Sequence, residues 1–232
     1  GALARRRLGA DAARWDTPRN VLVTAIETAD GLLAAARAEL SASSHTVTFV
    51  TTDVGSRGRF ENLNALVEEH LRPEHDWLLI LDDDVELPRG FLDRFLFLAE
   101  RFDLSIAQPA HRAYSHAAWP VTRRRSGSLV RETAFVEIGP VVAFRRDCFE
   151  SVLPFPALRV GWGVDAYWGA LAQQEGWRIG VVDAAAIEHA LRPVAASYDR
   201  ESAHSESQAF LATHPHISAA EAGRTFQTHR RY

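Results

Sequence analysis

Apolar and polar positions over the first 110 residues follow a rhythm of short β-branched runs and longer amphipathic segments. Short apolar runs are typical of buried strands, whereas apolar residues spaced three and four apart indicate helices. The runs predict strands at Val21–Ile26, Thr46–Thr51, Trp77–Leu81 and Leu104–Gln108, and helices at Gly31–Leu40, Arg59–Leu71 and Arg89–Phe102. This order predicts an α/β domain with a mostly parallel central sheet flanked by helices.

The rhythm changes after residue 110. The segment Thr122–Glu132 contains small residues and clustered arginines, and we expect a mobile loop there. The remaining elements are expected as strands in Ala134–Phe144 interrupted at Gly139-Pro140, a helix at Arg146–Val152, a loop at Pro154–Gly163, a helix at Asp165–Gln174, a strand at Trp177–Val182, and weak helices near Ser205–Ala212 and Ala219–Phe226. We therefore divide the chain into a lead-in (1–18), one domain (19–192) and a polar tail (193–232).

Composition adds several limits to this picture. A length of 232 residues, with 47% hydrophobic and 24% charged residues, is ordinary for a globular domain, and a net charge of −4 gives no electrostatic case for nucleic acid. All basic residues are Arg, which together with abundant Ala suggests a GC-rich, bacterial genome. The single Cys148 excludes an internal disulfide framework and a cysteine zinc cluster.

No apolar run approaches the roughly 20 residues of a membrane span, and cytoplasmic residence fits. Since Met is absent even at position 1, we expect the chain to begin inside a longer protein or after a removed tag.

The most informative polar feature is Asp82-Asp83-Asp84, which directly follows the apolar run Leu78–Leu81. Ligands bind at the carboxyl ends of strands in open α/β sheets. Three adjacent acids repel one another, and Mg²⁺ or Mn²⁺, which prefer carboxylate ligands and substrate phosphates, would remove that cost. The stretch therefore predicts a nucleotide-phosphate site, and the alternative is a solvated acidic turn before the next helix.

A second feature is the segment Gly161-Trp162-Gly163-Val164-Asp165. Two glycines allow a close backbone approach, and Trp162 offers an aromatic face for a sugar ring. Asp165 stands at the start of a predicted helix, where an Asp serves either as a catalytic acid or as an N-cap. Both readings stay open at this point, and one carboxylate can do both.

Four residues beyond these segments are weaker candidates. His189 follows an apolar segment and is either a metal ligand or an ordinary surface histidine. Arg192 either pairs with a diphosphate or lies on the surface. Glu27 and Asp53 follow the first two strands and are either donor contacts or turn residues.

Residues 58–66, followed by 76–84, resemble the donor half of the GT-A fold of nucleotide-sugar glycosyltransferases, where a helix carrying Asn-Ala precedes a strand ending in Asp-x-Asp. The resemblance implies that Asp84 holds a Mn²⁺ or Mg²⁺ ion together with His189 and Asp82. It also implies donor contacts from Glu27, Asp53, Arg59, Asp82, Asp83 and Arg192. Residues 19–110 would be the nucleotide-sugar half and residues 111–192 the acceptor half.

Residues 161–168 resemble the Trp-Gly-x-Glu-Asp acceptor segment of galactosyltransferase-like inverting enzymes. Asp165 matches the general base of that segment, whereas Val164 stands where the family has Glu. The resemblance implies acceptor contacts from Trp162 and Trp119, with His111, Tyr114 and His116 as further candidates. The Arg123–Arg125 run is either a solvated loop or a lid over the donor phosphates.

The resemblance therefore implies a metal-dependent glycosyltransferase. It would move a sugar, with inversion, from a nucleotide diphosphate sugar such as a UDP-sugar to a hydroxyl of a glycan or small-molecule acceptor. Two alternatives remain, a noncatalytic GT-A-like module that binds nucleotide or glycan within a larger protein, and a Mg²⁺-dependent nucleotidyltransferase. The chain contains neither a P-loop nor a Gly-x-Ser-x-Gly nucleophile elbow.

Overall fold

The computed structural model describes residues 2–13, 15, 17–28, 31–189 and 199–232, and it describes residues 2–6 by their backbone alone. The strands are β1 (Asn20–Glu27), β2 (Thr46–Asp53), β3 (Trp77–Leu81), β4 (Val85–Glu86), β5 (Leu104–His111), β6 (Val130–Thr133), β7 (Val141–Arg145), β8 (Arg178–His189) and β9 (Thr225–His229). The helices are α1 (Ala2–Ala13), α2 (Leu33–Ser41), α3 (Arg59–His70), α4 (Phe91–Arg101), α5 (Phe149–Val152), α6 (Val164–Glu175), α7 (Arg200–Leu211) and α8 (Ala219–Ala222), with short 3₁₀ turns at Pro120–Thr122 and Arg146–Cys148.

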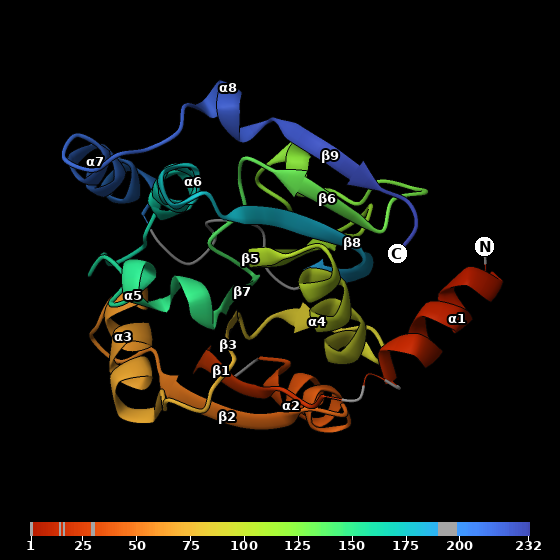
Figure 1. Ribbon diagram of the computed structural model, residues 1–232. Helices are drawn as coiled ribbons and strands as arrows, with labels where there is room; N and C mark the ends of the chain where they lie inside the picture. Colours follow the sequence, from red (N-terminus) through yellow and green to blue (C-terminus); the bar gives the residue numbers. More distant parts are fainter. Residues whose placement is uncertain (1, 14, 16, 29–30, 190–198) are drawn as a thin grey trace.

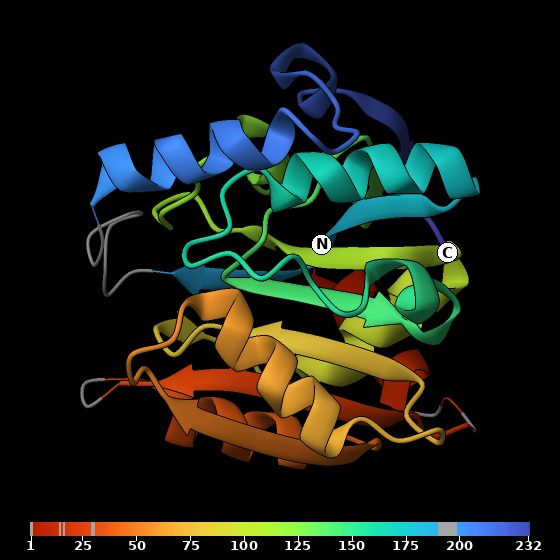
Figure 2. The same cartoon turned by 90° about the vertical axis from the view of Figure 1, so that its left-hand side faces the viewer.

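Within the described residues, nine strands form one sheet in the order β2-β1-β3-β7-β5-β8-β6-β9, with β4 attached to β8. Helices cover both faces of this sheet (Figures 1 and 2). One apolar cluster joins the sheet to α1, α2 and α4, and a second joins it to α3, α5, α6 and α7. Strand β3 shows why both faces are covered, because Trp77, Leu79 and Leu81 pack into the first cluster while Leu78 and Ile80 pack into the second. The predicted single α/β domain is confirmed.

The prediction of a mostly parallel sheet is wrong, because the sheet is mixed. β1 runs parallel to β2 and β3, and β5 runs parallel to β8. β7, in contrast, lies antiparallel to both β3 and β5, and β6 lies antiparallel to β8 and β9. β6 and β7 follow each other in the chain but are separated in the sheet by β5 and β8, and both run against these two strands. The strands after residue 110 therefore enter the sheet in both directions.

The structure confirms the predicted strands and helices of the first 110 residues, with boundaries shifted by a few positions. The helices expected at Arg146–Val152, Asp165–Gln174 and Ser205–Ala212 are also present in whole or in part. β8 continues well past the predicted Val182 and ends at His189. The division into lead-in, domain halves and tail stays a prediction, although β9, from the expected tail, pairs with β6.

Three predictions of local structure are wrong in part. The strand expected before Gly139-Pro140 is not formed, because β6 ends at Thr133 and β7 begins only at Val141. The expected loop Thr122–Glu132 ends in β6, where Arg131 is fully buried and forms a two-bonded ion pair with Asp183 at 2.8 and 3.0 Å. The expected weak helix at Ala219–Phe226 stops at Ala222, and an edge strand begins at Thr225. The strands β6 and β9 were not predicted because both contain polar residues. In β6, Arg131 is neutralised inside the protein, and β9 is partly exposed.

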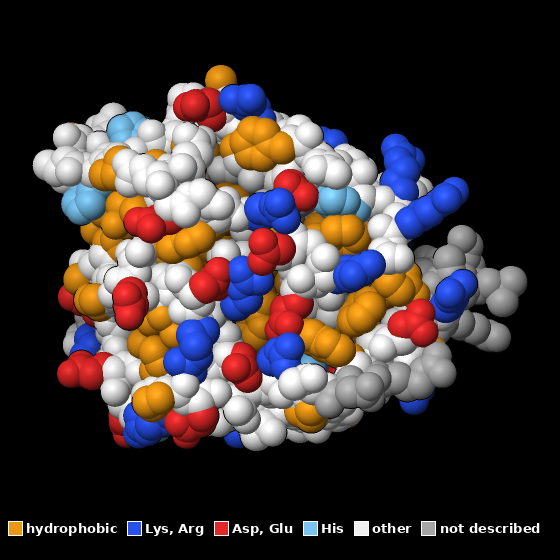
Figure 3. Space-filling model, viewed as in Figure 1, with side chains coloured by type: hydrophobic (Ala, Val, Ile, Leu, Met, Phe, Trp, Pro, Cys, Tyr) orange, Lys and Arg blue, Asp and Glu red, His pale blue; other side chains and the backbone are white. Residues whose placement is uncertain are grey.

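The surface is of mixed charge. On the face seen in Figure 3, basic and acidic side chains are interspersed with apolar ones, in keeping with the net charge of −4. In the part of the chain that the structure describes, every helix is too short or too polar to cross a membrane.

Candidate active site

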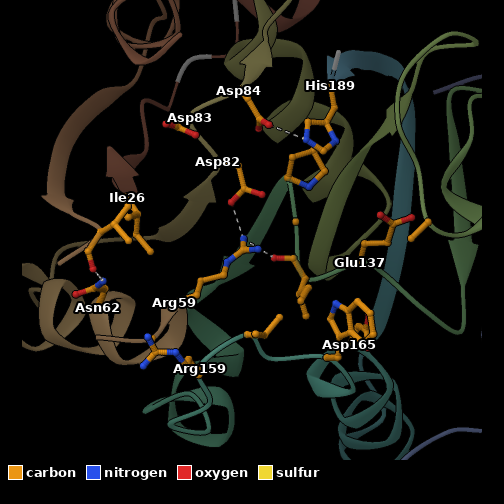
Figure 4. Close-up of a pocket in the computed structure, with 18 of the residues that line it drawn as sticks. Ile26, Arg59, Asn62, Asp82, Asp83, Asp84, Glu137, Arg159, Asp165 and His189 are labelled. Carbon is orange, nitrogen blue, oxygen red and sulfur yellow. Dashed lines mark hydrogen bonds and ion pairs between the residues drawn. The ribbon is translucent and has the colours of Figure 1, made fainter. Parts of the chain in front are cut away.

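A cleft of about 750 Å³ opens beside the carboxyl ends of β1 and β3. Its walls come from the acid triplet, the first turn of α3, the segment before β7, the loop before α6, and α7. Figure 4 shows Asp84 and His189 together, Arg59 reaching toward Asp82, and Glu137 and Asp165 at the same end, opposite Asn62. The structure therefore gathers the main predicted site residues in one cavity.

The three adjacent carboxylates have three different partners. Asp82 Oδ1 accepts a hydrogen bond from Arg59 Nη2 at 2.6 Å, and Asp84 Oδ2 lies 3.1 Å from His189 Nε2. Asp83 is buried and accepts hydrogen bonds from the backbone N–H of Thr28, at 2.9 Å, and from its hydroxyl. Asp83 thus braces the segment after β1, while Asp82 and Asp84 each carry one charged or titratable partner.

Besides its contact with Asp84, His189 has two hydrogen-bonding contacts that hold it in place. Its backbone N–H donates to Ser115 Oγ at 2.8 Å, and its Nδ1 lies 3.2 Å from the carbonyl oxygen of His116. A hydrogen bond from Nδ1 to a carbonyl fixes the ring and leaves Nε2 for a ligand. Burial alone lowers the pKa of His189, but the hydrogen bond and charge of Asp84, with the charge of Asp82, raise this pKa overall.

The predicted metal set of Asp82, Asp84 and His189 is only partly assembled. Among the described residues, no group of three His, Cys, Asp or Glu side chains could hold a metal ion. Asp84 and His189 are paired, whereas Asp82 is paired with Arg59. One carboxylate and one imidazole still fit Mn²⁺ or Mg²⁺ chemistry, because such sites are commonly completed by substrate phosphates and water.

Arg59 occupies the middle of the cleft. Its Nη2 also donates to the carbonyl oxygen of Ile138 at 3.1 Å, so the guanidinium bridges the strand end and the segment before β7. Burial raises the pKa of Asp82, and Arg59 opposes that shift. Arg57 and Arg159 line the same cavity, which gives it three guanidinium groups that suit an anionic ligand.

The loop 158–163 is fixed between two helices. The carbonyl oxygens of Leu158 and Arg159 accept the first N–H groups of α3, from Phe60 at 3.3 Å and Arg59 at 2.7 Å. On the other side, the carboxylate of Glu206 in α7 accepts three consecutive N–H groups, those of residues 159, 160 and 161, at 2.6, 3.0 and 3.1 Å. Helix ends leave such groups unpaired, and the loop satisfies those of α3.

Asp165 lies in the first turn of α6, two residues after Gly163. Gly163 is the N-cap, no side chain caps the helix there, and Asp165 Oδ1 accepts the adjacent N–H of Ala166 at 2.9 Å. The reading of Asp165 as a plain N-cap is therefore wrong. Burial raises the pKa of Asp165 to about 7, Glu137 adds to this shift, and nearby backbone N–H groups oppose it. A carboxylate that titrates near neutrality suits general-base chemistry.

The sequence analysis missed Glu137, which lines the cleft and is only 6% exposed. Its Oε1 accepts the backbone N–H of Trp119 at 3.0 Å and the hydroxyl of Thr122 at 2.5 Å. The signal that could have revealed it is an acid inside the apolar run from Phe135 to Ile138, since a buried acid needs partners.

The other predicted site residues lie in several places, and the acceptor candidates His111, Tyr114 and His116 do not line the cleft. Trp119 and Trp162 line the cleft. Glu27 and Asp53 face each other in register at the ends of β1 and β2 but are exposed and do not line it, although their neighbours Ile26, Thr28 and Val54 do. Arg192 lies outside the described residues. Residues 123–132, all described, do not line the cavity, so a lid role for that segment stays a prediction.

Comparisons with known proteins point to the fold. No protein-family model matches the chain, and no curated protein matches its sequence. Among solved structures, GalNAc-T7 with UDP, GalNAc and Mn²⁺ matches 78% of this chain with a TM-score of 0.52 and 10% identity, and the chain spans 45% of that protein. The catalytic domain of Drosophila beta1,4galactosyltransferase 7, in complex with xylobiose, matches 87% of this chain and 82% of its own length, with a TM-score of 0.54 and 12% identity. The chain therefore shares the fold of GT-A glycosyltransferases.

Proposed function

We propose that this protein is a metal-dependent glycosyltransferase that moves a sugar from a nucleotide diphosphate sugar, in particular a UDP-sugar, to an acceptor hydroxyl with inversion. The observation that carries the proposal is the shared cleft, which has the Asp84–His189 pair on one side and Asp165 on another. These side chains would supply the metal ligands and the general base that such a transfer needs.

The donor side is assigned from charge and position. Asp84 and His189 would hold Mn²⁺ or Mg²⁺, which as a Lewis acid stabilises charge on a departing diphosphate. Arg59, Arg57 and Arg159 offer guanidinium groups to the phosphates. Asp82 would contact the ribose or the donor sugar and would also be a metal ligand. Asp83 accepts a hydrogen bond from Thr28 and so holds the segment after β1 at the cleft. Glu27, Asp53 and Arg192 stay as proposed outer contacts.

On the acceptor side, Asp165 is assigned as general base. The attacking hydroxyl must lose its proton as the new bond forms, so a carboxylate must lie within hydrogen-bond reach. Asp165 has a pKa of about 7 and lines the cavity. Trp119 and Trp162 supply aromatic faces for a sugar ring in a glycan or small-molecule acceptor.

The experiment is a panel of nucleotide sugars incubated with the protein, Mn²⁺ and a panel of methyl pyranosides as acceptors, with release of nucleoside diphosphate as the readout. A transferase releases UDP from a UDP-sugar and stops doing so in EDTA. Release of pyrophosphate from a nucleoside triphosphate would instead identify a nucleotidyltransferase. Metal-dependent UDP binding without any turnover would identify a noncatalytic module.

A further inference from the structure

The acid that the acceptor segment lacks has a counterpart elsewhere in the chain. Val164 directly precedes Asp165 and is fully buried in the apolar cluster beneath α6, so the segment itself brings one carboxylate to the cleft. Glu137 reaches the same cavity from the segment before β7, 28 positions earlier than Asp165 in the chain. Figure 4 shows the two acids at the same end of the pocket.

The two carboxylate oxygens of Glu137 have different surroundings. Oε1 accepts hydrogen bonds from Trp119 N–H and from Thr122, whereas Oε2 lies 3.6 Å from Nε2 of His111, which is too far for a hydrogen bond. Among the described residues, Oε2 accepts no hydrogen bond, and its contact with His111 is an ion pair only when that ring is protonated. The carboxylate is held by one oxygen, and the other remains to accept from a ligand.

Glu137 also fixes an aromatic wall of the site. The N–H that its Oε1 accepts belongs to Trp119, whose ring packs against Phe135 with centroids 4.8 Å apart. One side chain thus sets the position of a lining tryptophan and offers an acceptor oxygen next to it. Trp119, Trp162, Glu137 and Asp165 give this end of the cleft two aromatic faces and two carboxylates.

We propose that Glu137 is the second acid of the acceptor site and selects a polyhydroxylated ring with two neighbouring hydroxyl groups, one directed to Asp165 and the other donating to Glu137. This inference rests on the proposed function, because it assigns Glu137 to the acceptor of that reaction. The acceptor is then an uncharged sugar and not a phosphate or a carboxylate, since the two carboxylates that receive it would repel an anion.

The charge of Glu137 acts on the pKa of Asp165, so replacing Glu137 should change the pH–rate profile, whereas replacing a merely structural residue should not. The titratable groups at this end are Asp165 in α6, Glu137 before β7 and His111 at the end of β5. The charge of Glu137 raises the pKa of Asp165, while N–H groups of Gly163, Asp165 and Ala166 lower it. Loss of the Glu137 charge should therefore move the acidic limb of the pH–rate profile to lower pH.

The test compares Glu137→Gln with Thr122→Val, which removes a hydrogen bond to Oε1 but leaves Oε2 and the charge intact. The measurements are binding of UDP with Mn²⁺ by calorimetry, binding of a panel of methyl pyranosides by saturation-transfer NMR, and transfer kinetics to the same glycosides. Glu137→Gln should bind UDP as wild type does and weaken glycoside binding roughly 10- to 100-fold, as expected for loss of a hydrogen bond to a charged group. Thr122→Val should lower the melting temperature without changing glycoside binding or the pH profile.

Each other outcome decides a separate point. If Glu137→Gln and Thr122→Val behave alike, with glycoside binding unchanged, Glu137 is structural and the inference is overturned while the proposed function stands. If the wild type cleaves no nucleotide sugar but binds glycosides through Glu137, the proposed function fails and the sugar site stands. If the wild type turns over a donor but binds no pyranoside of the panel, the acceptor class is wrong.

Discussion

Nε2 of His189 lies 3.1 Å from Oδ2 of Asp84, although the two residues are 105 positions apart in the chain. Strand pairing creates this contact, because β4 lies antiparallel to the end of β8 with Val85 opposite His189. Four complete strands (β4 to β7), three helices (α4 to α6) and two 3₁₀ turns intervene along the chain between the two residues. The last residue of β8 is thereby fixed beside the acid triplet at the end of β3.

The Asp84–His189 pair leads to a first prediction on metal-dependent donor binding. With UDP at about 100 times its Kd, Mn²⁺ should raise the melting temperature of the UDP complex by roughly 5–10 °C over EDTA. Asp84→Asn and His189→Gln should each remove that difference, because each loses one ligand. Glu86→Gln, an exposed change in the adjacent β4, is the control and should keep it. Equal UDP affinity in Mn²⁺ and EDTA for the wild type would count against the assignment.

The raised pKa of Asp165 predicts the pH dependence of both rate and stability. Only the ionised form can act as base, so the rate should rise with pH toward about 7 and level off above it. The folded pKa lies above the unfolded value of 3.8, so the contribution of Asp165 to stability is full below pH 3.8 and is lost as pH rises to about 7. Urea unfolding should therefore show that Asp165→Asn gains stability relative to wild type between pH 5 and pH 8. Glu175→Gln, at the exposed end of the same helix, should track the wild type.

The close packing at Gly161 predicts a large loss of stability on adding a side chain. Gly161 has a φ of +92°, and a Cβ there would stand 2.0 Å from a ring carbon of Phe60. Gly90 is a matched control, because its φ is +64° but a Cβ would meet nothing within 4 Å. Gly90→Ala should cost about 1–2 kcal/mol for backbone strain alone, and Gly161→Ala should cost about 1–3 kcal/mol more for the overlap. Denaturant unfolding of the two variants measures the difference, and equal losses would mean that the loop moves away from Phe60 freely.

The three N–H groups held by Glu206 predict that α7 stabilises the loop before α6. Glu206→Gln should lower the free energy of unfolding by roughly 1–3 kcal/mol, since hydrogen bonds to a charged acceptor are lost or weakened. Hydrogen exchange should also rise at residues 159–161. Glu201→Gln, exposed in the first turn of α7, should change stability by about 0.5 kcal/mol or less. Unchanged exchange in Glu206→Gln would show that other contacts hold the loop.

Much of the first 110 residues could be predicted because local patterns and tertiary structure agree there. The apolar runs of β1 and β3 are buried strands, β2 is a partly exposed strand parallel to β1, and the acid triplet follows β3 as expected. His189 and Asp165 could be placed near the triplet only through the resemblance, and both line the same cleft. Their roles stay proposals.

What could not be predicted depends on contacts between distant residues. Arg131 looked like part of a solvated loop, but Asp183 neutralises it inside the protein. Glu137 has hydrogen-bond partners 15 and 18 positions away, at Thr122 and Trp119, so nothing next to it in the sequence reveals them. The reversed direction of β7 likewise depends on its insertion between β3 and β5, which come earlier in the chain, and its apolar residues do not reveal this.

The central claim is that Asp165 is the general base of an inverting sugar transfer. Its most direct test measures UDP release and the anomeric configuration of the product, with UDP binding measured alongside, for the wild type and Asp165→Asn in Mn²⁺. The account predicts an inverted product from the wild type and, in the variant, turnover reduced about 10²–10⁴-fold with UDP binding unchanged. Near-normal turnover in a folded Asp165→Asn variant, or a product that retains the donor's configuration, would contradict it.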